Sequence, residues 1–210
     1  MIPLVGMDER VLVALADENW KLGEIVGRAR YDSAIAAGRH VFDNGRAASV
    51  EEIIDEYVHG ARGEIAVHGL FPWLPWHDLS DRVDDLPDIG DFIDVKAPAQ
   101  DPSSNKPRKL IAYDSQLRND WAFVLALYVG RQRFRIMGWA SSAELRAAPI
   151  KELQPGRPCH VLEPSIPPLH PLRQLQEIAL TRHHRQALEK EKEHERSTSG
   201  ERSAQSGDGA

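Results

Sequence analysis

Residues 87–96 read Pro-Asp-Ile-Gly-Asp-Phe-Ile-Asp-Val-Lys, and this stretch decides the predicted fold. Gly90 marks a turn, and the residues after it have the composition of a buried β-strand. Because alternate side chains of a strand share a face, Asp94 and Lys96 should project together, roughly 6.6 Å apart along the chain. With Asp88 they place two carboxylates and a lysine beside apolar residues, which is costly unless something compensates the charges. The stretch therefore predicts a Mg²⁺ or Mn²⁺ site, suited to metal-assisted hydrolysis of phosphodiester bonds.

The composition is that of one globular domain with a polar extension. The chain has 210 residues, and its 41% hydrophobic content is sufficient for a core. A formal net charge of −6 argues against a protein that coats nucleic acid through bulk electrostatics, although a nuclease needs only a local basic rim. The single cysteine, Cys159, excludes an internal disulfide and fits a reducing compartment. Since no segment has the pattern of a signal peptide or a membrane span, we expect a cytoplasmic protein with no membrane contact.

The first third of the chain is predicted to be helical. Apolar residues recur at helical spacing over 8–28. Ser49, followed by Glu52 three residues later, has the pattern of a capping box that begins a further helix. Gly60 and Gly63 are expected to interrupt that helix.

The middle of the chain is predicted to form strands. We expect them at 86–89, 92–97, 109–113, 121–129 and 133–139. Gly130 and Arg131 lie between two apolar runs and indicate a hairpin, and Ser141 to Glu144 has the pattern of a short helix start. Helices followed by strands predict an α/β (α+β) protein with a central mixed β-sheet flanked by helices.

We expect a single domain over 1–188, followed by a tail. Its parts are predicted to be N-terminal helices at 8–45, a core at about 50–145 and a proline-rich extension at 149–188. Within that extension we expect little regular structure from 149 to 171 and a final helix from 172 to 188. Residues 189–210 lose almost all large apolar side chains, which predicts a disordered C-terminal tail.

The acidic residues around the central stretch allow two interpretations. Seven aspartates lie between Asp78 and Asp94, and they form either an acidic loop before an ordinary strand or part of a functional site. A functional site needs a third carboxylate, for which Glu64 is the candidate. The alternative for Glu64 is an exposed glutamate in a first helical turn, where the helix dipole favours it. Asp91 is the rival of Asp88, but it lies at the turn.

The motif resembles that of a known nuclease group. Pro87-Asp88 followed by Asp94-Val95-Lys96 is similar to the signature of the PD-(D/E)XK nuclease superfamily. The resemblance covers roughly residues 50–140 and implies a restriction-endonuclease-like core. Aspartate stands at position 94, where glutamate is commoner in the family.

The resemblance implies a role for each site residue. Asp88 and Asp94, with the backbone carbonyl of Val95, would hold Mg²⁺ or Mn²⁺. Glu64 would bind a metal-bound water or a second ion. Lys96 would orient the attacking water and stabilise charge on the phosphate.

Two basic groups are candidates for contacts with DNA. Arg131, Arg133 and Arg135 alternate, so they share one face of the predicted return strand. Such a row also occurs as a solvated sheet face or a protected edge. Lys106, Arg108 and Lys109 form a second basic cluster.

Two hypotheses follow for the function. The first is a Mg²⁺-dependent endonuclease that hydrolyses DNA phosphodiester bonds. The alternative is a non-catalytic nucleic-acid-binding or protein-assembly module that keeps a nuclease-like fold. The oligomeric state is open, and a homodimer is one option.

Overall fold

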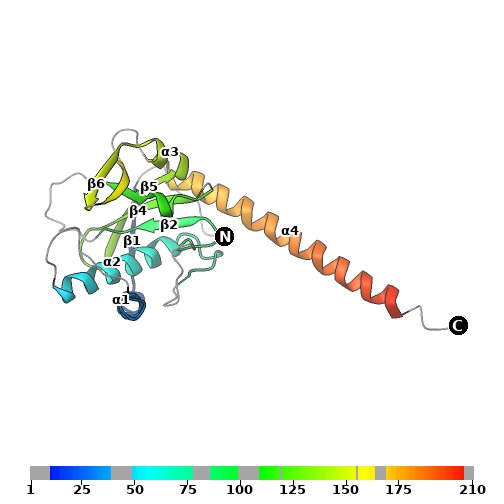
Figure 1. Cartoon of the computed structure of the whole chain (residues 1–210). Coiled ribbons are helices and arrows are strands. Elements are labelled where there is room, and N and C mark those ends of the chain that lie inside the picture. Colours follow the sequence, from blue (N-terminus) through cyan, green and yellow to red (C-terminus); the bar gives the residue numbers. More distant parts are fainter. Residues whose placement is uncertain are drawn as a thin grey trace. The chain divides into compact units, whose positions relative to one another are not determined.

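The computed structural model describes residues 10–38, 49–77, 86–98, 109–118, 120–154, 156–163 and 169–205 (Figure 1). The chain divides into two compact units, 1–173 and 174–210. In chain order the described elements are β1 (Val11–Ala14), α1 (Asp17–Ala36), α2 (Val50–His68), β2 (Ile93–Lys96), β3 (Leu110–Tyr113), a 3-10 helix (Asp114–Gln116), β4 (Ala122–Tyr128), β5 (Arg133–Ser141), α3 (Ser142–Ala147), β6 (Ile150–Gln154), β7 (Arg157–Leu162) and α4 (Leu172–Gln205). The predicted combination of helices and strands is confirmed.

The larger sheet has four strands in the order β1-β5-β4-β2. β5 is antiparallel to both β1 and β4, whereas β2 is parallel to β4, so the sheet is mixed as predicted. The hairpin between β4 and β5 is also confirmed, and Arg131 adopts a left-handed conformation there with φ 51°. Of the predicted strand at 86–89, only two isolated bridges of Ile89, to Trp76 and to Ile93, are present.

Helix α2 covers one face of this sheet, and α1 lies beside α2 (Figure 1). Gly63 lies so close to the sheet that a Cβ built on it would stand 2.2 Å from the Cβ of Ala97. Because side chains alternate along a strand, Asp94 and Lys96 project from the opposite face to Ala97. There the Lys96 Nζ lies 5.7 Å from the centroid of the Phe123 ring.

The capping box that begins α2 is confirmed. The Ser49 hydroxyl accepts a hydrogen bond from the Glu52 amide, and the Glu52 carboxylate accepts one from the Ser49 amide. The predicted interruption at Gly60 and Gly63 is wrong, because α2 continues to His68. At Gly63 the glycine serves close packing against Ala97, the residue after β2, rather than a helix end.

The N-terminal prediction is wrong in its first residues. Instead of one helix over 8–28, strand β1 occupies Val11–Ala14 and α1 begins at Asp17. Pairing with β5 overrides the helical spacing of the apolar residues. The predicted N-terminal helical region 8–45 is described only for 10–38.

The second sheet was not predicted. β3, β7 and β6 form an antiparallel sheet in the order β3-β7-β6, although little regular structure was expected at 149–171. Pro158 lies in the central strand of this sheet, opposite Glu152, at the point where the pairing register shifts. A proline fits such an irregularity because the ladder there does not require its missing N–H.

Helix α4 extends beyond its predicted end at residue 188. Residues 189–205 were expected to be disordered, and the structure instead continues the helix to Gln205, while 206–210 lie outside the described residues. Glutamate, lysine and arginine are strong helix formers, so a sequence without apolar residues still favours this conformation. None of the described helices is long and apolar enough to cross a membrane.

Candidate active site

The site begins with the turn that precedes β2. The Ile89 amide donates to the Ile93 carbonyl at 3.0 Å, and the Ile93 amide donates to the Ile89 carbonyl at 3.1 Å. Gly90 closes this turn with φ 61°, a left-handed conformation that glycine adopts without strain. Asp88 precedes Ile89 and Asp94 follows Ile93, so the two aspartates flank this bridge. In regular antiparallel pairing, residues in such positions have Cβ atoms about 4.5–5.5 Å apart. The two predicted aspartates therefore lie on either side of the Ile89–Ile93 bridge.

Asp88 is buried and has a structural partner. Only 3% of the residue is exposed, and its Oδ2 accepts a hydrogen bond from the Val95 amide at 2.5 Å. β2 is an edge strand of the sheet, so this carboxylate satisfies a backbone donor that would otherwise lack a partner strand.

Asp94 and Lys96 form an ion pair, which their predicted position on one face of the strand allows. The Lys96 Nζ lies 2.8 Å from the Asp94 Oδ1, and their side chains are 21% and 10% exposed. Asp91, the alternative to Asp88, is exposed on the turn. The lysine thus lies next to one of the two buried aspartates.

Glu64 is buried, and the structure gives it partners that the sequence did not indicate. Arg30 of α1 donates from Nη1 to Oε1 and from Nη2 to Oε2, each at 2.7 Å. The indole Nε1 of Trp76 donates to the same Oε2 at 3.2 Å. The predicted alternative of an exposed glutamate is wrong, since Glu64 is 4% exposed in the interior of α2.

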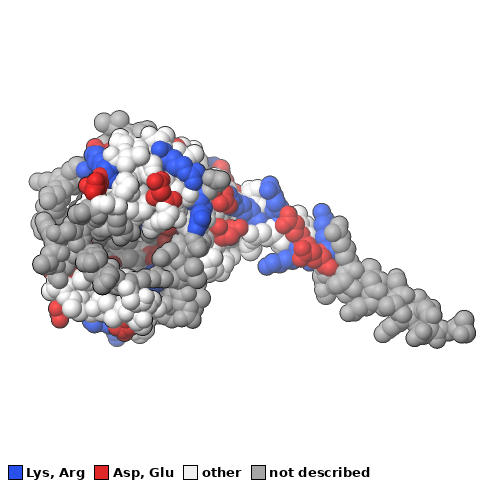
Figure 2. Space-filling view, in the orientation of Figure 1, with Lys and Arg blue, Asp and Glu red and all other residues white. Residues whose placement is uncertain are grey.

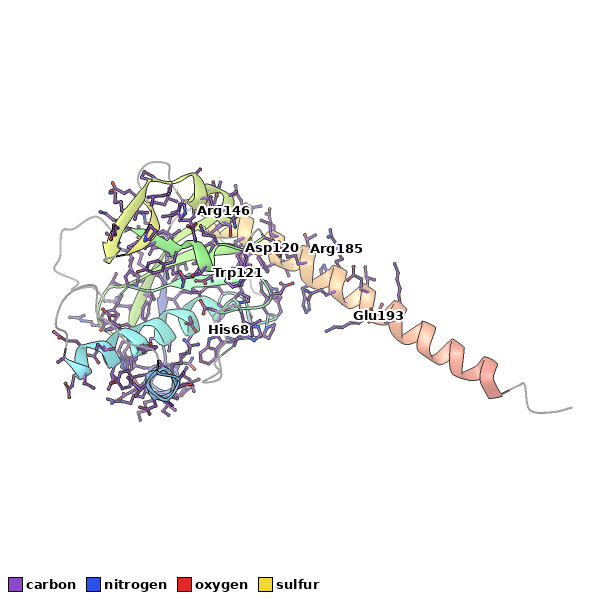
Figure 3. All side chains as sticks on the ribbon, in the orientation of Figure 1. His68, Asp120, Trp121, Arg146, Arg185 and Glu193 are labelled. Carbon is purple, nitrogen blue, oxygen red and sulfur yellow. The ribbon has the colours of Figure 1, made fainter. Side chains whose placement is uncertain are left out.

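The segment after α2 connects Glu64 to the Asp88 turn. The His77 carbonyl accepts a hydrogen bond from Arg30 Nη2 at 3.1 Å, and the His77 amide donates to the Asp88 carbonyl at 2.9 Å. The His77 Nε2 lies 2.7 Å from the Gly90 carbonyl, so that nitrogen carries the proton. His68, labelled in Figure 3, ends α2. Its ring stacks on that of Trp76 with centroids 6.4 Å apart.

The donor set suits a small cation held by two carboxylates. In the described part of the chain, no three or more His, Cys, Asp or Glu side chains are grouped so that they could hold a metal ion. Mg²⁺ is commonly held by one or two protein carboxylates, with water at its other positions. Asp88, Asp94 and the Val95 carbonyl supply oxygen donors of the kind that Mg²⁺ prefers. Glu64 fits poorly as a third ligand, because both of its oxygens already bind Arg30.

The predicted DNA-contacting arginines lie on and beside β5. Arg131 and Arg135 are exposed and Arg133 is half-buried. Arg135 pairs with Leu127, which shares a face of β4 with Phe123, the residue opposite Asp94. Arg135 and Asp94 therefore lie on the same face of the sheet.

The second basic cluster is described only at Lys109. Its Nζ lies 3.7 Å from Glu163, while Lys106 and Arg108 lie outside the described residues. On the face shown in Figure 2, the coloured basic and acidic side chains are interspersed. On this face, any favourable field for a phosphate backbone would therefore be local.

Comparison with known proteins finds no relative. No protein-family model, curated protein or solved structure matches the chain.

Proposed function

We propose that the chain is a Mg²⁺- or Mn²⁺-dependent endonuclease that hydrolyses phosphodiester bonds of DNA in the cytoplasm, on a restriction-endonuclease-like core. The observation that supports it most directly is the turn whose Ile89–Ile93 bridge is flanked by the buried Asp88 and Asp94, with the Lys96 Nζ 2.8 Å from the Asp94 Oδ1. Burying two carboxylates beside a half-buried lysine costs free energy that an apolar strand would avoid. A catalytic role would account for that cost.

Each residue has a distinct task in this proposal. Asp88 and Asp94, with the Val95 carbonyl, would hold the cation. When bound, the cation supplies Lewis-acid stabilisation of the phosphate and lowers the pKa of its bound water. Lys96 places a positive charge beside Asp94, where it orients water and stabilises charge that develops on a phosphate oxygen.

A second candidate is a non-catalytic binding or assembly module with the same fold. Two contacts favour it, because Arg30 neutralises Glu64 and Asp88 holds the Val95 amide, so both acids have structural partners. Calorimetric titration with Mn²⁺ separates the two candidates, since the module requires no metal affinity at Asp88 and Asp94.

Cleavage of plasmid and linear DNA in Mg²⁺ or Mn²⁺ tests the enzyme proposal. Asp94→Asn removes a ligand charge and Lys96→Met keeps the apolar stem without the ammonium, so each should lower the rate by about 100-fold or more. Asp91→Asn is the matched control, because it changes an exposed aspartate on the same turn and should leave the rate unchanged. Cleavage that persists in both site variants, with folding intact, would reject the proposed site.

A further inference from the structure

We infer that Arg30 and Glu64 position the Asp88 turn, and that Glu64 is not a metal ligand. We call Arg30, Glu64, Trp76 and His77 the Arg30 brace. What the brace contributes to activity depends on the proposed nuclease function, but its effect on the Asp88 turn does not.

The first step is the geometry of the ion pair at the centre of the brace. The Arg30 guanidinium meets the Glu64 carboxylate through two parallel contacts of 2.7 Å, and both side chains are at most 10% exposed. Two charge-assisted bonds in a low dielectric are far stronger than a surface pair. Arginine stays protonated, so a cation that approached Glu64 would compete with a permanent positive charge.

The second step is the path from the ion pair to Asp88. Arg30 also donates to the His77 carbonyl, and the His77 amide donates to the Asp88 carbonyl. Trp76 bonds Glu64 through its indole and pairs with Ile89 through its backbone. Residues 76 and 77 are thus fixed on one side by Arg30 and Glu64, and on the other by the turn that carries Asp88.

The third step is the end of this path. The Asp88 carboxylate binds the Val95 amide, so the position of the turn determines how well that amide is protected. When Arg30 is replaced, the buried Glu64 carboxylate loses the cation that pairs with it. Glu64 and the residues bonded to it must then shift so that the carboxylate reaches water. The Val95 amide therefore reports on the brace without any activity measurement.

Helix α1 supplies a matched control. Arg28 also pairs with a glutamate, Glu24, at 3.2 Å, but their side chains are 57% and 45% exposed. An exposed i,i+4 pair contributes little, and its loss leaves no buried charge.

The test uses the full chain and two measurements, amide hydrogen exchange by NMR and Mn²⁺ binding by calorimetry. Arg30→Met should speed exchange of the Val95 amide roughly tenfold or more, whereas Arg28→Met should not change it. Trp76→Phe removes one donor to Glu64 and should give a smaller increase, and it serves if Arg30→Met fails to fold. Glu64→Gln should keep the wild-type Mn²⁺ affinity, while Asp88→Asn and Asp94→Asn should weaken it.

Each result decides a separate question. Unchanged Val95 exchange in folded Arg30→Met or Trp76→Phe would overturn the brace. If Mn²⁺ bound more tightly to Arg30→Met and no longer bound to Glu64→Gln, Glu64 would be a metal ligand that Arg30 blocks in the wild type. That result would also overturn the inference. A wild-type chain that binds no Mn²⁺ would instead reject the proposed metal site, while the exchange data would still judge the brace.

Discussion

At the scale of single residues, Gly63 sets the distance between α2 and β2, and thereby the place of Glu64 beside it. A Cβ at position 63 would stand 2.2 Å from the Cβ of Ala97, whereas a Cβ at Gly60 would meet nothing within 4 Å. Gly63→Ala should therefore destabilise the protein by about 1–3 kcal/mol through overpacking. Gly60→Ala, in the same helix, should stabilise it by about 0.4–1 kcal/mol. Urea unfolding measures both, and equal effects would contradict this account of the packing.

The sequence reveals which side chains share a strand face, but not which distant residues form an ion pair. The shared face of Asp94 and Lys96 follows from strand period alone, and the 2.8 Å ion pair agrees with it. The partner of Glu64 does not follow from any local pattern. Arg30 lies 34 residues away on another helix, and only the packing of α1 on α2 brings it to the carboxylate. A buried glutamate requires a partner, but local sequence does not say which one.

At the scale of elements, the short helix α3 depends on its capping box. The Ser141 amide and hydroxyl donate to one Glu144 oxygen, each at 2.7 Å, and His170 contacts the other oxygen at 2.6 Å. Burial raises the pKa of Glu144, but the bonds from Ser141 and His170 outweigh burial and lower that pKa below its ordinary value of 4.5. The ionised carboxylate is thus the form that stabilises the folded state.

This cap gives a pH dependence with a definite sign. Because the folded-state pKa of Glu144 is lowered, its stabilisation is complete above about pH 4.5 and is lost as the pH falls through the folded-state value. The free energy of unfolding, measured from neutral pH to about pH 3, should fall less steeply in Glu144→Gln than in the wild type. Ser141→Ala should cost about 1 kcal/mol at neutral pH. Parallel pH profiles for wild type and Glu144→Gln would show that this carboxylate is not linked to folding.

The strands show why local signals find some elements and miss others. The β4–β5 hairpin was predictable because two apolar runs flank Gly130, and its turn needs only local geometry. β6 and β7 were not, because proline at 149 and 158 argues against regular structure. A register shift beside Pro158 removes the conflict, and such a shift is set by the paired strands rather than by either sequence alone.

At the scale of the whole molecule, charge limits how a DNA duplex would be recognised. The chain carries a formal net charge of −6, so affinity for phosphates must come from a local group of cations. Arg135 is such a cation, on the same sheet face as Asp94. The order of helical and strand patterns in the sequence predicts the mixed sheet and the helices. It does not predict that β3 belongs to a second sheet, because β3 pairs there with β7, a strand that the sequence did not indicate.

A cation that binds only the folded chain must stabilise it as a whole. At a free concentration of one hundred times Kd, the stabilisation is about 2.7 kcal/mol, which for a chain of this size raises Tm by roughly 5–11 °C. Thermal unfolding with and without Mn²⁺ should show this rise in the wild type and in Asp91→Asn, and its loss in Asp94→Asn, with reversal by a chelator. An equal rise in Asp94→Asn would place the cation elsewhere, with the aspartates between 78 and 85 as the next residues to substitute. The thermal shift therefore tests whether the cation that stabilises the folded chain binds at Asp94.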